Sequence, residues 1–587
     1  MKLNINKFLR EFITKLWQSI KRFPQAIILA AAAVVIFIVL NHINPTNNIP
    51  QELLTRAALT CALGIPLFLS ISIYLETITG AKRLWKAILH SSSTAILLLY
   101  YFFLLKKLDN TSNFRYIAIS FSLYLLFLFL PRLKNKDNYE IYIINVMIKF
   151  MITYFYSFIL YLGLAAIVFT INSLFGANIS GSIYLDILAI VTGIFAPIFF
   201  LSSFPVTGEA FTLGNYSKIL SVLLQYILMP LITAYTIILY AYFIKILIIH
   251  ALPQGLISNL VLWYSIITTT VIFLAYPLIN MGKWIGAFIS TIPKVIIPLL
   301  GVMFAAMAIR INAYGITESR YYVILSGLWV LCSMIYFIIY RKVHNIYLVI
   351  SLSLIAFLSV VGPWSSFSIS KYSQNNRFEN LVKKNNMLTN NTITKPSKEP
   401  SEKDKAEISS IILYFQNNHS LKELKLLPNN FNTDKMKETF GFDLYYSINY
   451  SEGQNKNNYF NYTLQNNNTL LAIKDYDYFI NISDPEPINS KISQGTIEVS
   501  YNSNSKEFKI LKDNKEIYAQ AMGRLLSNIQ ESNGSNYNQS KDNMTFIDRN
   551  AAAEVTYIFN QINGYKEVSS EKVKIDNINA NVFIKLK

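Results

Sequence analysis

The run Ala26–Leu40, AIILAAAAVVIFIVL, has fifteen consecutive apolar residues and follows a basic segment at the start of the chain. A helix needs about 20 apolar residues to cross the hydrocarbon core of a bilayer, and residues 24–41 approach this length. Ten further apolar runs follow, near residues 53–78, 88–106, 114–131, 146–172, 184–204, 222–247, 259–279, 293–310, 320–340 and 346–363. A soluble core cannot bury so many runs, so the sequence predicts an all-α polytopic membrane domain, residues 24–365, with about eleven transmembrane helices.

Charge is distributed unequally along the 587 residues. Residues 1–365 hold 25 Lys and Arg and 9 Asp and Glu, a formal charge of +16, whereas the remainder carries only +2. Cations collected in loops between apolar runs are typical of membrane proteins, and they differ from the basic surface that binds nucleic acid. The lipid bilayer is therefore the expected partner of this region, and no nucleic-acid partner is expected.

Residues 1–23 form a basic N-terminal segment with two open interpretations. Leu9, Phe12, Leu16, Ile20 and Phe23 recur at helical spacing between Lys and Arg, which suits an amphipathic helix on an anionic membrane surface. A basic flank that only sets the orientation of the first span explains the charges equally well. The run that follows lacks a small-residue cleavage pattern, so we expect a retained first helix.

Lys and Arg in the short loops predict the orientation of the spans. With the N-terminus inside, inner loops hold Lys82, Arg83, Lys86, Arg132, Lys134, Lys136, Lys283, Arg341 and Lys342, besides the basic residues of 1–23. Outer loops hold chiefly Lys106, Lys107, Arg115, Lys245, Arg310 and Arg320. This bias predicts a cytoplasmic N-terminus and, after an odd number of spans, a C-terminal region outside the membrane.

The composition changes after residue 365 to Asn, Ser and Lys. Residues 366–405 are expected to be a polar juxtamembrane segment and linker, and residues 406–587 a small soluble α+β domain. Ser401 can cap a helix in which Ile408, Ile411, Ile412 and Phe415 share one face. Alternating runs follow, including a hairpin of 496–501 with 507–511 and a last strand near 573–586, while 517–529 has a helical pattern.

The sequence indicates no enzyme class. It contains no phosphate-binding loop, no GxSxG turn and no dinucleotide fingerprint after a strand. The five His residues are scattered, and both cysteines, Cys61 and Cys332, fall inside apolar runs. We therefore predict no metal site and no cofactor.

The densest group of polar residues is Arg310–Tyr322, RINAYGITESRYY, between the ninth and tenth runs. Gly315 can adopt a left-handed conformation that ends one helix, and Thr317 can cap the next. Glu318 then lies in a first helical turn, where the helix dipole favours an anion, and Arg310 and Arg320 are expected close enough to pair with it. One interpretation is a rigid helical hairpin turn. The other is an anion or headgroup site formed by Arg310, Tyr314 and Arg320 around Glu318.

The stretch RINAYGITESRYYVILSGLW, with KRFPQAIILA, LYAYFIKILI and ISKYSQNNRFENLV, resembles bacterial membrane proteins of the family named domain of unknown function 4153. The resemblance covers about residues 20–390, and its most specific part is the YGITExRYY turn. It implies a multispanning protein of the bacterial plasma membrane, and it implies no activity, substrate or catalytic residue.

Two functions fit these observations. The first is a non-enzymatic envelope or interaction protein whose C-terminal domain meets an envelope protein or polymer through residues 406–587. The alternative is a transporter or lipid-handling permease with a polar site near Arg310, Glu318 and Arg320. Prolines inside the apolar runs kink helices, as in transporters, although they are also common in membrane helices generally. These prolines are Pro66, Pro197, Pro230, Pro277, Pro293 and Pro298.

Overall fold

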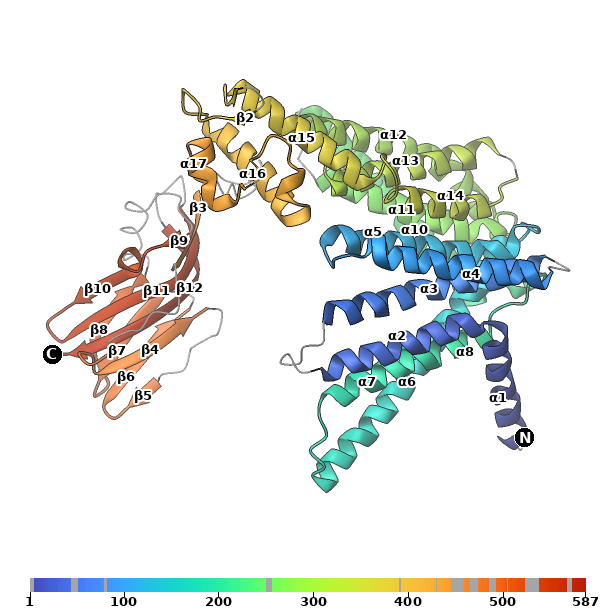
Figure 1. Ribbon diagram of the computed structural model, residues 1–587, viewed down its shortest axis with the longest axis horizontal. Helices are drawn as coiled ribbons and strands as arrows, with labels where there is room; N and C mark the ends of the chain where they lie inside the picture. The colour runs from blue at the N-terminus through green and yellow to red at the C-terminus, as the bar shows by residue number, and fades with distance from the viewer. Residues whose placement is uncertain are drawn as a thin grey trace. The chain divides into compact units, whose positions relative to one another are not determined.

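A computed structural model describes residues 5–43, 51–78, 82–249, 256–340, 342–389, 392–428, 430–444, 458–464, 473–484, 492–503, 505–522, 538–566 and 573–587. The chain packs as two compact units, Met1–Ser447 and Ile448–Lys587. Helices form the first unit and strands dominate the second (Figure 1). The range 406–587, expected as one soluble domain, thus contributes residues to both units.

The apolar runs fold as helices, as predicted. Among the described residues, ten helices are long and apolar enough to cross a membrane, and an eleventh apolar helix is shorter. The N-terminal segment also forms a helix, α1 (Ile5–Arg22). The apolar helices are α2 (Pro24–His42), α3 (Gln51–Thr77), α4 with η1 (Arg83–Leu99, Tyr100–Leu104), α5 (Asn110–Phe129), α6 (Tyr139–Phe175), α7, η3 and α8 (Ser182–Ile190, Val191–Phe195, Ala196–Ser202), α9, η5 and α10 (Lys218–Val222, Leu223–Leu228, Met229–Ile249), α11 (Leu256–Ala275), α12 (Lys283–Tyr314), α13 (Glu318–Ile339) and α14 (Ile346–Leu358).

Hydrogen bonds between loops define two faces of this helical bundle. At the first face, where α2 begins, Arg22 pairs with Glu76 at the end of α3 (2.8 Å), and Lys134 after α5 donates to the Thr77 carbonyl. Lys342 after α13 pairs with Asp137 before α6 (3.4 Å). At the second face, where α13 begins, Asn41 at the end of α2 donates to Asp186 near the start of α7 (2.8 Å). The Leu108 N–H, before α5, donates to Glu52 at the start of α3 (3.3 Å).

The shorter helix α14 carries the chain from the first face back to the second. It begins beside Asn345, whose amide donates to Glu140 at the start of α6. Midway, Ser122 of α5 donates to the Ser353 carbonyl (2.8 Å), and past the end of α14 Ser359 lies 3.4 Å from the Tyr322 hydroxyl in the first turns of α13. Its thirteen residues are fewer than the predicted 346–363, because residues 359–365 turn instead, with Gly362 at φ +84°.

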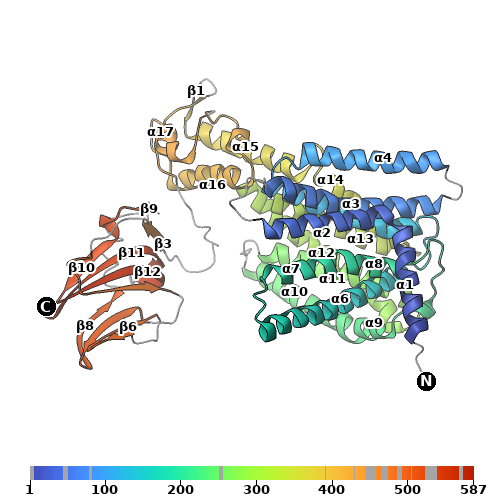
Figure 2. The same ribbon diagram turned by 60° about the horizontal axis from the view of Figure 1, so that its bottom comes forward.

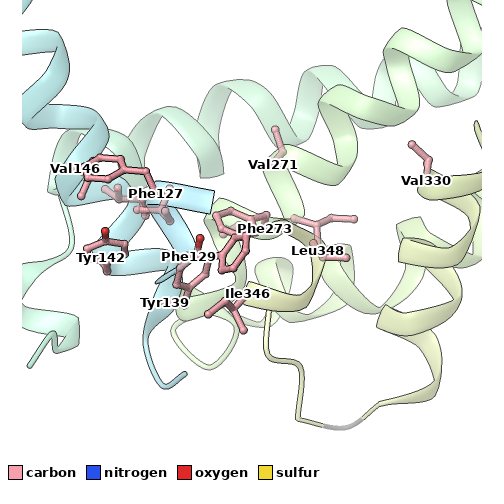
Figure 3. Close-up of a cluster of buried hydrophobic side chains, with 14 of the residues drawn as sticks. Phe127, Phe129, Tyr139, Tyr142, Val146, Val271, Phe273, Val330, Ile346 and Leu348 are labelled. Atoms are coloured by element: carbon pink, nitrogen blue, oxygen red, sulfur yellow. The ribbon is translucent and has the colours of Figure 1, made fainter. Parts of the chain in front are cut away.

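An aromatic cluster fills the interior near the first face (Figure 3). Tyr139 meets Phe273 of α11 edge to face (6.1 Å between ring centroids) and lies beside Tyr142 (5.9 Å). Ile346 and Leu348 of α14 pack into the same cluster. The cluster therefore joins α5, α6, α11 and α14.

Residues 366–444, called here the membrane-proximal segment, have their own small core within the first unit. They form α15 (Ser366–Lys384), strands β1 (Leu388–Thr389) and β2 (Thr392–Ile393), α16 (Glu402–Asn418), the short helices η7 (Leu421–Glu423) and η8 (Thr433–Lys435), and α17 (Met436–Phe440). Ser401 caps α16, as predicted, by accepting from the Asp404 N–H. Ile408, Ile411, Ile412 and Phe415 are buried against Phe378 and its neighbours, so the apolar face predicted for this helix is confirmed.

The second unit consists of two sheets over one core (Figure 2), and their strands pair antiparallel except for the parallel pair β3 and β9. One sheet has the order β4-β12-β11-β3-β9, with β10 also on β11, and the other has the order β5-β6-β7-β8. Their bounds are β3 (Asn458–Leu464), β4 (Tyr478–Ser483), β5 (Ile492–Gln494), β6 (Ile497–Asn502), β7 (Glu507–Lys512), β8 (Lys515–Ala521), β9 (Asn538–Gln539), β10 (Thr545–Arg549), β11 (Ala553–Lys566) and β12 (Val573–Leu586).

The predicted hairpin is confirmed as β6 and β7, and the last strand as β12. The helix predicted over 517–529 is wrong for 517–521, which belong to β8, and residues 523–529 lie outside the described residues. Pairing with β7 overrides the helical pattern here, because Tyr518 points into the core between the two sheets.

Candidate functional site

The turn between α12 and α13 contains the residues that the sequence singles out. Gly315 follows Tyr314, the last residue of α12, and has φ +67° and ψ 178°. Gly315 ends the helix with a positive φ, but its extended ψ differs from the predicted left-handed helical conformation and lies in a region that essentially only glycine adopts. Thr317 occupies the N-cap position of α13, as predicted, but its side chain makes no capping hydrogen bond.

Helix α15 satisfies the backbone groups of this turn. Gln374 donates to the carbonyls of Tyr314 (3.1 Å) and Ile316 (3.0 Å), and the Ile316 N–H donates to the Ser373 hydroxyl (2.8 Å). The last carbonyls of a helix have no partner within the helix, so these contacts fix the turn from outside. These contacts favour the interpretation as a rigid turn, and the residues that hold it lie about 60 positions further along the chain.

The arginines near the turn bind backbone carbonyls and aromatic rings. Arg320 donates to the carbonyls of Tyr314 (3.0 Å) and Gly315, and its guanidinium lies 5.7 Å from the centre of the Tyr314 ring. Arg377 of α15 lies over the same ring (5.8 Å) and pairs with Glu407 of α16 (2.9 Å). Two cations therefore lie against the Tyr314 ring.

The expected pairing of Glu318 with Arg310 or Arg320 is wrong: within the described part of the chain, the ion-pair partner of the Glu318 carboxylate is His419, and neither arginine lies within 4.0 Å of it. Glu318 and Arg320 are two positions apart on one helix, and residues at that spacing point to different sides. Arg310 lies on the preceding helix, more than a turn before its end. The structure thus places Arg320 beside Tyr314 and Gly315, and Glu318 elsewhere.

The partners of Glu318 come from the membrane-proximal segment. Its carboxylate accepts from the Tyr414 hydroxyl (2.8 and 2.9 Å) and from Nε2 of His419 (2.8 Å). The His419 side chain is 2% exposed and that of Glu318 is 16% exposed. Burial, reinforced by the adjacent carboxylate, raises the pKa of Tyr414 well above its ordinary value. Tyr414 therefore stays protonated and donates. We call Glu318, Tyr414 and His419 the anchor triad.

Two further contacts join the end of α16 to the start of α5 at the same face. Asn110 donates to the Asn417 carbonyl (3.0 Å), and Thr111 donates to the Asn418 carbonyl (3.2 Å). These carbonyls belong to the last turn of α16, where a helix lacks internal partners. Helix α16 is thus attached to two membrane helices through its C-terminal end.

A second buried polar group lies at the first face. Arg132, 3% exposed, donates to the carbonyls of Glu209 and Asp137 (2.8 Å each), and its guanidinium lies over the rings of Tyr142 and Phe211. Nearby, Glu140 is 5% exposed and accepts from the amide of the fully buried Asn345. These contacts tie the start of α6 and the loop before it to the loop after α8 and to the loop before α14.

Sequence reasoning missed the buried contacts of Arg132 and those of Glu140. It treated Arg132 as a loop cation and began the fifth span at residue 146, whereas α6 begins at Tyr139. The available signal was the sequence YEIY, residues 139–142, in which one carboxylate stands among apolar residues that continue directly into the span. His419 gave no local signal.

Among the described residues, no three His, Cys, Asp or Glu side chains gather to hold a metal ion. The polar groups around Glu318 and around Arg132 are both hydrogen-bonded internally and connect elements of the chain. Such contacts attach one element to another: Arg132 donates to backbone carbonyls, and the Glu318 carboxylate accepts from Tyr414 and His419.

The bundle and its anchor triad define a multispanning integral membrane protein with an attached membrane-proximal segment. Residues 26–388 match the family model described as domain of unknown function (DUF4153), and the chain belongs to this family. A stretch of 230 residues is 28% identical to an uncharacterised protein of Pasteurella multocida (strain Pm70), covering 37% of this chain and 38% of that relative. No solved structure matches the chain.

Proposed function

We propose that this chain is a non-enzymatic protein of the bacterial plasma membrane that holds its C-terminal region outside the cell, where it interacts with an envelope protein or polymer. The observation that carries the proposal is the anchor triad. It is a buried contact between a membrane hairpin and α16, in which one carboxylate accepts hydrogen bonds from two donors. A carboxylate with two donors in a nearly closed site is suited to fixing one element on another.

The arrangement of the faces supports this orientation. The first face carries the loop cations Lys82, Lys134 and Lys342 with their neighbours, besides the basic helix α1. Short loops rich in Lys and Arg are retained on the cytoplasmic side. The membrane-proximal segment is attached at the second face, and the proposal therefore puts this segment outside.

Cysteine labelling tests the orientation. In a background of Cys61→Ala and Cys332→Ala, we would place a cysteine at Ser505, exposed in the second unit, and in a matched variant at Asn135, exposed in a first-face loop. An impermeant thiol reagent on intact cells is expected to label the Ser505→Cys variant and to label Asn135→Cys only after lysis. The reverse pattern would overturn the proposed orientation.

A permease is the second candidate, favoured by irregular membrane helices. Within the described residues, three spans contain π-helical turns, at η1, η3 and η5, and such turns occur frequently at functional sites. A permease with its site at Glu318 predicts that Glu318→Gln changes solute movement in reconstituted vesicles while α16 stays attached. The interaction protein predicts the opposite: α16 loosens and solute movement is unaffected.

A further inference from the structure

The six-stranded sheet of the second unit has one surface made of amide side chains. Ladder pairing places Asn581 of β12 directly opposite Asn481 of β4, and Gln561 of β11 opposite Thr463 of β3. Alternate residues of a strand point to the same side, and Ile482, Ala580 and Val582 between them are buried in the core. The outward side is therefore polar. We call Thr463, Asn481, Asn560, Gln561, Asn579 and Asn581 the amide face.

Hydrogen bonds hold these amides in fixed orientations. Asn481 donates to Asn581 (2.8 Å), Asn581 donates to Asn560 (3.3 Å), and Asn560 donates to Asn579 (2.8 Å). An amide has two donor hydrogens and an oxygen with two lone pairs. Each of these bonds uses one donor hydrogen of one amide and one lone pair of the next. The hydrogen-bonded amides are therefore fixed in orientation and still keep further donor hydrogens and lone pairs.

A β-bulge shapes the surface into a hollow. The pairing of β11 with β12 shifts between Phe559 and Gln561, so that Asn560 is an extra residue in β11. Bulges redirect side chains, and here Asn560 turns to bond Asn579 and Asn581 on the outer side. A hollow of about 210 Å³ results, lined by Thr463, Asn560, Gln561, Asn579 and Asn581. Sites for drug-sized ligands reach roughly 300–1,000 Å³, so this hollow suits one small ring or group of a longer chain.

One polar atom in the hollow lacks a partner. The Thr463 hydroxyl oxygen is buried and makes no hydrogen bond to the described residues. Buried polar atoms are normally paired, so this hydroxyl is an unsatisfied polar group at the wall of the hollow. Next to the hollow, Phe479 is 56% exposed and lies against Phe583 (5.1 Å), on the same side of β4 as Asn481. An apolar ring surface thus borders the amides.

We propose that the amide face binds a neutral glycan, with one sugar ring over the hollow. Sugar hydroxyls donate and accept at once, as amides do, and the carbon-bound face of a sugar ring matches an exposed aromatic ring. The amide face contains no charged side chain, which disfavours a polyanion. β11 and β12 are paired on both sides, so a peptide cannot add to them as a strand. This inference deepens the proposed function by naming the partner class, and the binding itself does not depend on membrane orientation.

Calorimetry on the full chain tests the proposal. The chain is solubilised in lauryldimethylamine oxide, because a maltoside detergent would itself present sugars to the site. Cellotetraose and chitotetraose are titrated as neutral probes that differ in their acetamido groups, and heparin is titrated as a polyanion. We expect binding of at least one neutral probe, unchanged when salt is raised. Whichever neutral probe binds shows whether hydroxyls alone or acetamido groups are recognised.

Thr463→Val is the decisive variant, because it removes a hydroxyl that has no protein partner and keeps the side-chain shape. It is expected to weaken binding by about tenfold, the effect of one lost hydrogen bond, without lowering the melting temperature. Asn581→Ala should weaken binding further, and Gln520→Ala on the other sheet should leave it unchanged. The proposal would be overturned if neither neutral probe bound, or if Thr463→Val and Asn581→Ala left binding unaffected. Salt-sensitive binding of heparin alone would also overturn it. Cysteine labelling of Ser505→Cys is independent of all these outcomes, so failure of glycan binding is distinguishable from a wrong orientation.

Discussion

Glu318 and His419 are 101 positions apart in the chain, and their side chains meet at 2.8 Å across the boundary between a membrane helix and α16. Tyr414 completes the contact from the same helix, with its hydroxyl 3.0 Å from His419 Nε2. A charge-assisted hydrogen bond in such a closed place is stronger than one between neutral exposed groups. The anchor triad is therefore the contact whose loss should affect the membrane-proximal segment most.

Glu318→Gln and His419→Leu are each expected to destabilise the attachment of α16 by about 1–3 kcal/mol, because a buried polar group loses its partner. The double variant should cost less than the sum of the two, since both act on one contact. Hydrogen exchange of the α16 amides measures the effect. Glu379→Gln, which breaks the exposed pair with Lys383 on α15, is the matched control and should change exchange little. Additive effects of the two anchor variants would contradict the assigned contact.

Gly315→Ala should loosen the turn between α12 and α13. A side chain at φ +67° and ψ 178° is strained by about 1–3 kcal/mol, and the new Cβ would lie 2.9 Å from Gln374 and 3.2 Å from Ser373. We expect a lower melting temperature in nanodiscs and faster proteolysis of the membrane-proximal segment. Gly301→Ala, in the same helix with open space around it, is the control and should be tolerated. Equal behaviour of the two variants would refute this account of the turn.

The pair Lys384–Asp404 should make the α15–α16 contact sensitive to acid. Burial of Asp404 favours its protonated form, but hydrogen bonds from Lys384, Ser401 and Asn385 outweigh this effect and hold the pKa of the carboxyl below its ordinary value. A carboxyl whose pKa is lower in the folded state stabilises the folded protein at pH values above its unfolded-state pKa of about 3.9. This stabilisation is lost as the pH falls through the folded-state pKa. Wild type should therefore melt higher than Asp404→Asn at pH 7, and the two melting curves should converge below about pH 4. A constant difference across this range would exclude the carboxylate as its source.

Asn345→Leu should destabilise the first face, because it leaves the buried Glu140 carboxylate without its amide donor. The expected cost is about 1–3 kcal/mol. Glu140→Gln removes the buried charge while keeping an acceptor oxygen for Asn345, so it should cost less. Thermal unfolding in nanodiscs compares the two variants. If Glu140→Gln were the more damaging, the carboxylate charge itself would have a role beyond packing.

The membrane architecture was predictable because the bilayer demands long continuous apolar runs, and each run is visible locally. The turn at Gly315 was predictable for a similar reason, since a glycine between two helical patterns signals a change of direction. The partner of Glu318 was not. Helix geometry excludes Arg320, and His419 follows an ordinary Gln-Asn-Asn sequence at the end of a distant helix, so only the folded chain brings the pair together.

The amide face shows the same limit in the second unit. Asn577, Asn579 and Asn581 alternate in the sequence, as expected for one side of a strand. However, the bulge at Asn560 and the register of β4 against β12 arise from pairing between segments far apart. The local pattern thus fits one polar side of the predicted last strand, but it does not show which amides meet.

Helix α14 has thirteen residues, which span about 20 Å at 1.5 Å per residue, whereas the hydrocarbon core is about 30 Å thick. Helix α14 begins at the first face, beside the start of α6. The part of the hydrocarbon core that it does not span therefore lies at the second face, where the hydroxyl groups of Ser359, Ser366 and Tyr322 lie next to one another. A short hydrophobic stretch is accommodated by thinning of the surrounding bilayer. We therefore expect a local depression in the lipid surface beside α14, at the level where Tyr322 meets the buried hydroxyl groups of Ser359 and Ser366.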